Sequence, residues 1–241
     1  MKDKVYRRPS QIVDFAFNDS VAAVFPDMIR RSVPGYELII PMTGLIAAEH
    51  LPTGGLVYDL GCSLGASSAA VLDQAPSADV KVIAVDSSPA MIEHATAHFD
   101  DPRIDLRCAD LLETSVLGAD VIILNFVVQF LAPEQRLNFF KRLRAEMNRS
   151  GVIIVSEKIS QPDDGSPLAF PSLHLQWKRA NGYSDLEVSQ KRQALENVMR
   201  IDDEATHFER FQKAGFGHVR QWFRCLNWAS YLVFATQDTL R

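Results

Sequence analysis

The sequence predicts an α/β fold with a mostly parallel β-sheet and helices on both of its faces. Three observations predict it: short runs rich in Val, Ile and Leu, helix-length segments that alternate with these runs, and a glycine-rich turn between the first run and a helix. Dense apolar runs are typical of parallel strands, because both of their faces are buried. The 241 residues fit one domain, with residues 1–50 as a helical N-terminal cover and residues 161–200 as a helical insertion.

Five strands are predicted in the body of the chain and a hairpin near its end. Ser88 can cap a helix that starts at Pro89, and Pro133 opens another, because proline fits the first helical position. A last helix is expected over residues 202–214. The predicted strands are residues 56–60, 81–86, 104–110, 120–126 and 152–157, followed by a hairpin of residues 219–226 and 229–235.

Charge and composition exclude several classes of protein. The formal net charge is −5, so the summed field repels a phosphate backbone and we expect no stable binding of nucleic acid. The start of the chain is polar, and the most hydrophobic window, residues 121–131, is interrupted by Asn125 and Gln129. We therefore expect no membrane span and no signal peptide. Three scattered cysteines without metal-ligand spacing favour the cytoplasm and predict no metal site.

The strongest motif is Asp59-Leu60-Gly61-Cys62-Ser63-Leu64-Gly65, which follows a strand and precedes a helix. Glycines let a backbone approach a ligand closely, and the amides of a helix start attract a carboxylate or phosphate. The third glycine of the dinucleotide fingerprint is missing, which disfavours NAD, while Asp86 ends the next strand, where a carboxylate can accept both ribose hydroxyls. Together these features predict an adenosine ligand without a pyrophosphate. A ligand-free turn and a helix-capping Asp86 are the alternatives.

Polar residues also end the third and fourth predicted strands, at Asp110 and Asn125. They fall at the sheet edge where open α/β proteins bind ligands. In the insertion, Arg192 lies at the edge of an apolar stripe of Val188, Leu195 and Met199, and a guanidinium facing such a surface needs an anion. We expect a ligand carboxylate there; an arginine paired within the protein is the alternative. His174 and His207 are expected to be structural, Glu157 and Lys158 receive no role, and the aromatic cluster around Trp228 is expected to pack in the core.

Several blocks of the chain resemble one family, the carboxy-S-adenosyl-L-methionine synthases of the class I methyltransferase superfamily. The blocks are Ser32-Val33-Pro34-Gly35-Tyr36, the glycine turn from Tyr58 to Gly65, and Lys178-Arg179-Ala180-Asn181-Gly182-Tyr183. The resemblance implies a Rossmann-like sheet of seven strands, six parallel and one antiparallel, and a homodimer. It also implies that Arg192 grips the added carboxylate and acts in catalysis with Tyr36. The residues implied to surround the ligand are Tyr36, Gly61, Cys62, Ser63, Asp86, Ser87, Asp110, Leu111, Asn125 and Arg192.

The same resemblance implies the reaction. Such enzymes convert S-adenosyl-L-methionine and prephenate to carboxy-S-adenosyl-L-methionine and phenylpyruvate, and a second enzyme uses the product on the wobble uridine of tRNA. Because prephenate itself supplies the carbon dioxide and a base, no dedicated side-chain base is required. The chain departs from the family at Ser87, where Asn is expected, around residues 99–102, which look shortened, and at Trp177 and Trp228, which replace phenylalanines.

Two other functions fit the same residues. One is an ordinary methyltransferase that acts on a small molecule or on tRNA through the same pocket. The other is a non-catalytic module that binds a derivative of S-adenosylmethionine. Arg192 separates the first from the leading hypothesis, and turnover separates the second.

Overall fold

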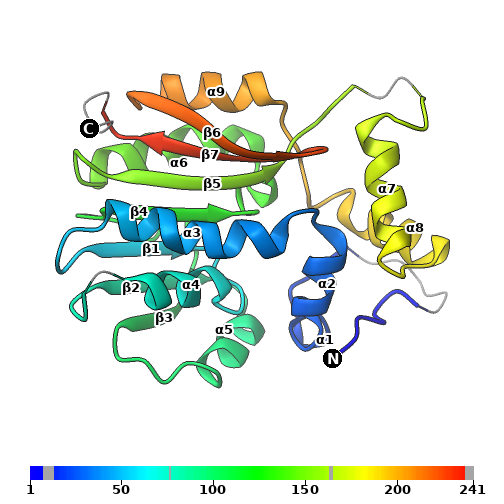
Figure 1. Ribbon diagram of the computed structural model, residues 1–241, viewed down its shortest axis with the longest axis horizontal. Helices are drawn as coiled ribbons and strands as arrows, with labels where there is room; N and C mark the ends of the chain where they lie inside the picture. The colour runs from blue at the N-terminus through cyan, green and yellow to red at the C-terminus, as the bar shows by residue number, and fades with distance from the viewer. Residues whose placement is uncertain (8–13, 76, 163–164, 237–241) are drawn as a thin grey trace.

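A seven-stranded sheet forms the centre of the computed structural model, which describes residues 1–7, 14–75, 77–162 and 165–236 (Figure 1). The strand order is β3-β2-β1-β4-β5-β7-β6. Only β7 runs antiparallel to its neighbours, β5 and β6, so the predicted arrangement of six parallel strands and one antiparallel strand is confirmed. The strands are β1 (Leu56–Leu60), β2 (Lys81–Asp86), β3 (Ile104–Cys108), β4 (Val121–Asn125), β5 (Val152–Lys158), β6 (His218–Cys225) and β7 (Trp228–Phe234).

Helices cover both faces of this sheet, and alternate residues of one strand pack against each layer. Ile122 and Leu124 join a core cluster that includes Phe140 of α6 (Pro133–Glu146) and Phe211 of α9 (Glu204–Lys213). Val121 and Ile123 point the other way, towards α3 (Tyr36–His50) and α4 (Ala66–Gln74). Burial on both faces is why these strands are continuously apolar. The sequence therefore predicted the layering correctly.

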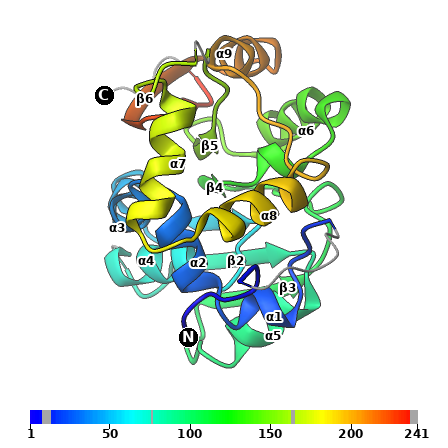
Figure 2. The same cartoon turned by 90° about the vertical axis from the view of Figure 1, so that its right-hand side faces the viewer.

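The carboxyl ends of the parallel strands are covered by segments from both halves of the chain (Figure 2). The N-terminal cover contains two helices before α3, which starts at Tyr36. The insertion contains two helices, and its residues 163 and 164 lie outside the described ranges. The remaining helical segments are α1 (Asp19–Ala22), α2 (Phe25–Ser32), α5 (Pro89–Thr96), η1 (Val128–Phe130), α7 (Phe170–Ala180) and α8 (Asp185–Leu195).

Hydrogen bonds tie the N-terminal cover to the insertion. The guanidinium of Arg31 donates to the carbonyl of Asn181 at 2.7 Å, and the hydroxyl of Tyr183 donates to the carboxylate of Asp3 at 2.5 Å. The amide of Phe15 donates to the carbonyl of Ala194 at 2.9 Å. The two segments thus form one roof over the sheet edge. In the described ranges, no helix is both long and apolar enough to cross a bilayer.

Candidate functional site

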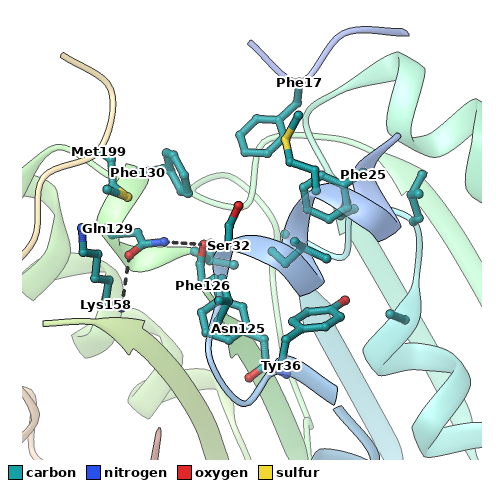
Figure 3. Close-up of a pocket in the computed structure, with 18 of the residues that line it drawn as sticks. Phe17, Phe25, Ser32, Tyr36, Asn125, Phe126, Gln129, Phe130, Lys158 and Met199 are labelled. Atoms are coloured by element: carbon teal, nitrogen blue, oxygen red, sulfur yellow. Dashed lines mark hydrogen bonds between the residues drawn. The ribbon is translucent and has the colours of Figure 1, made fainter. Parts of the chain in front are cut away.

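A cavity of about 510 Å³ lies between the carboxyl edge of the sheet and this roof (Figure 3). Its size is in the range of pockets that hold small molecules. Its walls come from α2, from the strand ends, from η1 and from the insertion. The predicted site residues that line the cavity are Tyr36, Gly61, Cys62, Ser63, Asp86, Ser87, Asp110, Leu111 and Asn125.

The glycine turn forms the floor of the cavity. Two of its glycines occupy positions that no other residue could take. Gly61 has a φ of 78° and Gly65 a φ of 79°, in the left-handed region. A Cβ on Gly61 would lie 2.6 Å from a methyl carbon of Val127, and one on Gly65 would lie 2.5 Å from the ring of Phe99. Both glycines are therefore required by packing and by backbone conformation, independently of any ligand.

Asp86 is held at the end of β2 by backbone donors. The amide of Ser63 donates to its Oδ2 at 2.8 Å, and the amide of Ser88 donates to its Oδ1 at 2.9 Å. Each carboxylate oxygen still has a lone pair free for a further donor. The carboxylate can therefore accept two vicinal hydroxyls while it remains anchored. Asp110 lies two residues beyond the end of β3, so its predicted place on the strand itself is wrong, although it does line the cavity.

Asn125, the last residue of β4, presents an unsatisfied acceptor. Its amide nitrogen donates to Thr43 Oγ1 at 3.2 Å and to Ser67 Oγ at 2.9 Å. Its Oδ1 is buried and has no partner among the described residues. An unpartnered buried acceptor costs free energy unless a donor meets it. A ligand ammonium or hydroxyl fits this position, as the amino end of an adenosyl-amino-acid ligand would provide.

Burial sets the protonation of the groups under the cavity. Burial raises the pKa of Asp59 to about 6, although the hydroxyl of Ser68 donates to its carboxylate at 2.7 Å. Burial, with the nearby Asp59, raises the pKa of Tyr36 to about 12 and also raises the pKa of the Cys62 thiol. Tyr36 therefore keeps its proton and can act as a hydrogen-bond donor, whereas Cys62 is not a nucleophile here.

Aromatic rings from the N-terminal cover and from η1 line the cavity. Phe17 packs edge-on against Phe130 with ring centroids 5.4 Å apart. The ring centroids of Phe17 and Phe25 are 6.2 Å apart. Figure 3 shows these rings, from the N-terminal cover and from η1, above the polar floor. Trp228, predicted to be core, also lines the cavity, where its ring meets Phe126 at 5.4 Å. Residues of the N-terminal cover, Phe15, Phe17 and Phe25 among them, thus contribute to the cavity wall.

Arg192 does not line the cavity in this chain. Its side chain is exposed on α8, and the side chain turned inward is that of Lys191, which is 5% exposed and donates to Ser32 Oγ at 2.9 Å. The expectation that Arg192 faces the packed stripe is therefore corrected, and Met199 lies beyond the end of α8. Arg192 is nevertheless close enough for its charge to lower the pKa values of Lys158 and Lys178. Its contact with a ligand stays a prediction.

A group of basic side chains at the β5 end of the cavity was missed from the sequence. Lys158, Lys178 and Lys191 line it together with His174. Burial and the neighbouring lysines lower the pKa of His174 to about 3, so its ring is neutral and its Nε2 donates to the carbonyl of Ser32 at 2.8 Å. The helical spacing of the sequence could have indicated these residues. Lys178 is one helical turn after His174, and Lys191 is three residues after Val188, so each pair shares a helix face.

Within the described residues, no group of three or more His, Cys, Asp or Glu side chains is arranged to hold a metal ion. The three cysteines, Cys62, Cys108 and Cys225, are free thiols.

Residues 57–151 match the family described as "Methyltransferase domain". Solved structures of methyltransferases share the fold at low identity. Human N-acetylserotonin methyltransferase in complex with SAM has a TM-score of 0.62 at 19% identity, with 90% of this chain and 55% of that chain covered. The mitomycin 7-O-methyltransferase MmcR has a TM-score of 0.59 at 17% identity, with 91% and 60% covered. These likenesses show a class I methyltransferase fold.

Sequence relatives extend the match to the whole chain, including the roof. The carboxy-S-adenosyl-L-methionine synthase of Geobacter sp. (strain M21) is 46% identical over 238 residues, which cover 96% of this chain and 98% of that protein. The synthase of Actinobacillus succinogenes is 43% identical, with 96% and 98% covered. Identity at this level includes the segments that the methyltransferase family match leaves out, and the chain therefore belongs to the carboxy-S-adenosyl-L-methionine synthase family.

Proposed function

We propose that the protein converts S-adenosyl-L-methionine and prephenate to carboxy-S-adenosyl-L-methionine and phenylpyruvate. The observation that carries the proposal is the chain-wide similarity to synthases of this name, which includes the insertion that brings basic side chains to an adenosyl-type cavity. The methyltransferase fold with its glycine turn is shared by enzymes with many different activities and would not by itself indicate this reaction. The lysine-rich wall is the feature that suits a reaction of carboxylates.

The reaction balances without an acid or base from the protein. In prephenate the bond to one carboxyl carbon breaks, the ring becomes aromatic, and the hydroxyl leaves with a proton taken from the methyl group of S-adenosylmethionine, giving water. A new carbon–carbon bond joins that methyl carbon to the released carboxyl carbon. The residues of the chain have to bind the two substrates side by side and exclude water. The aromatic roof of Phe17, Phe25 and Phe130 is suited to the second task.

In this proposal Tyr36 and Arg192 are the candidate catalytic residues. Tyr36 lines the cavity and stays protonated, so it can donate to a developing carboxylate. Arg192 is exposed, and reaching the ligand requires its long side chain to turn from solvent towards the lysine end of the cavity. Arg192→Ala should lose carboxy-S-adenosyl-L-methionine while S-adenosylmethionine still binds, as calorimetry can measure. Equal weakening of both ligands would mean that Arg192 is structural.

The direct test is incubation of the protein with S-adenosylmethionine and prephenate labelled in its carboxyl carbons. The expected product is S-adenosylmethionine heavier by carbon dioxide and carrying the label, with phenylpyruvate formed in equal amount. Transfer of an unlabelled methyl group to an acceptor, with no carboxylated product, would support an ordinary methyltransferase in its place. Tight ligand binding without any turnover would support the non-catalytic module.

The setting of this activity is also part of the proposal. The product would serve a second enzyme that modifies the wobble uridine of tRNA in the cytoplasm, and the net charge of −5 is consistent with a protein that does not itself hold tRNA. The protein would act as a homodimer; Phe170 and Trp177 of α7 and Leu168 beside it are exposed apolar side chains suited to an interface. Sedimentation at working concentration should give twice the chain mass, and a monomer there would remove the dimer.

A further inference from the structure

Two lysine ammonium groups at the β5 end of the cavity have no bonding partner within the described part of the chain. Lys158 ends β5, and Lys178 lies on α7 with only 9% of its surface exposed. Neither ammonium has a hydrogen bond or an ion pair with any residue in the described ranges, and both side chains line the cavity. Figure 3 shows the Lys158 side chain near Gln129 and Met199, on the opposite side of the view from Phe25.

The surroundings of these two lysines make the protonated, charged form of each side chain less stable. The pKa of Lys158 is lowered by burial and by Arg192, and the pKa of Lys178 falls to about 8 through burial, Lys158 and Arg192. Lys191 adds a third ammonium, although it is bonded to Ser32 and lies 5.3 Å above the ring of Tyr183. A buried charge is strongly unfavourable unless an opposite charge meets it. Since no carboxylate among the described residues is bonded to either ammonium, a ligand is suited to supply that charge.

An unpartnered donor lies beside the lysines. Trp228 is the residue opposite Lys158 in the antiparallel ladder between β5 and β7, and its indole nitrogen is buried without an acceptor among the described residues. His174 packs against the same indole at 5.7 Å. Indole nitrogen only donates, so the group still needs an acceptor atom. Donors without acceptors on neighbouring residues indicate an acceptor-rich ligand.

The position of the cluster separates it from the nucleoside floor. Asp86, the glycine turn and Asn125 lie at the ends of β2, β1 and β4, and Lys158 lies at the end of the next strand in the sheet, β5. With strands about 4.8 Å apart, three steps place Lys158 roughly 14 Å from Asp86. An adenosyl ligand on the floor therefore leaves the lysine end for a second molecule.

We infer that Lys158 and Lys178 form the subsite that holds the carboxylates of a dianionic second substrate. A dianion matches the two unpartnered ammonium groups in charge, whereas a monoanion would leave one of the two ammonium groups without an opposite charge. The identity of that dianion as prephenate rests on the proposed function. Lys191 and Arg192 strengthen the positive field of the subsite from α8.

Substitution of the lysines by methionine tests the subsite, because methionine keeps most of the length and volume and removes the charge. For Lys158→Met and Lys178→Met, we expect the KM for prephenate to rise about ten- to hundred-fold, the range expected when a charged hydrogen bond is removed. The affinity for S-adenosylmethionine should stay the same or increase, because a cation near the sulfonium is gone. Lys141→Met, at an exposed position on α6, is the matched control and should change neither.

A binding measurement separates this inference from the proposed function. Protein loaded with S-adenosylhomocysteine has no methyl group to react, so calorimetry with prephenate reports binding alone. Weaker prephenate binding in both lysine variants, with S-adenosylhomocysteine binding retained, supports the subsite even if no carboxylated product is ever found. Unchanged prephenate binding in both variants, or equal loss of both ligands, overturns the subsite and leaves the proposed function standing if the wild type turns over.

Discussion

The backbone amide of Ser63 donates to the carboxylate of Asp86 at 2.8 Å and so locks the glycine turn to the end of the neighbouring strand. The turn is fixed a second time by the amides of Gly61 and Cys62, which donate to the carbonyl of Val85 at 2.7 and 3.0 Å. Asp86 therefore has both a structural bond and free lone pairs facing the cavity. This double use makes the residue testable by a substitution that keeps its shape.

Asp86→Asn should weaken S-adenosylmethionine binding by about ten- to hundred-fold, because neutral oxygen accepts ribose hydroxyls less strongly than a carboxylate. Calorimetry measures the change. Asp105→Asn, which removes an exposed carboxylate paired with Arg107 on β3, is the control and should bind normally. Normal affinity in Asp86→Asn would mean that the ribose lies elsewhere.

Gly61→Ala should destabilise the fold and block the ligand floor, because the new Cβ would meet Val127 at 2.6 Å at a φ of 78°. Gly54→Ala is a matched control: its φ is 70°, and no atom lies within 4 Å of the new Cβ. Its cost should be limited to about 1–2 kcal/mol for the left-handed backbone. Urea unfolding should give a clearly larger loss for Gly61→Ala, and similar losses would contradict the crowding at Val127.

The stability of the protein should rise with pH above neutrality through Lys191. Burial, with the charges of Lys178 and Arg31, lowers the pKa of Lys191 to about 7, although Asp3 and Asp27 oppose the shift. Between that value and its ordinary pKa of 10.5 the unfolded chain binds more protons, so the unfolding free energy gains up to about 1.4 kcal/mol per pH unit from this group. Lys191→Met should remove that slope in urea titrations at pH 7, 8 and 9. If the unfolding free energy changed with pH equally in the wild type and in Lys191→Met, the Lys191 ammonium would be hydrated in the folded protein and the prediction would be wrong.

Asp202→Asn should be strongly destabilising, because its carboxylate meets two arginines inside the fold. Arg136 donates to Asp202 Oδ2 at 2.6 Å from a side chain that is 1% exposed, and Arg210 bonds the same oxygen. Leaving two buried guanidinium groups with one fewer anion should cost about 3–5 kcal/mol. Asp185→Asn breaks the exposed pair with Arg179 and should cost below about 1 kcal/mol. Comparable thermal unfolding of the two variants would contradict the difference in burial.

The fold and the floor of the site were predictable because each depends on local sequence. The density of Val, Ile and Leu predicted the strands. The spacing of Gly61 and Gly65 predicted the turn on which the ligand prediction rests. The roof was less predictable. Lys191 and Arg192 both stand three or four residues from Val188 and Leu195, so helical spacing alone cannot choose between them. The choice is made by Ser32 and the ring of Tyr183, which accept the ammonium of Lys191.

Trp228 gives a second example of the same limit. Its aromatic neighbours predicted core packing, and it is 5% exposed. What the sequence does not contain is the register that sets Trp228 opposite Lys158 and so beside the cavity. Long-range pairing of this kind depends on the assembled sheet, and no spacing within either strand reports it.

The bond from the Phe15 amide to the Ala194 carbonyl joins the N-terminal cover to the end of the insertion, which is synthesised much later. During synthesis the nucleoside floor is complete by about Asn125, whereas the roof has to wait for the insertion. A nascent or truncated chain that stops before α8 would expose its aromatic cover to water and hold a nucleoside loosely. The complete roof therefore forms only after synthesis has passed Ala194.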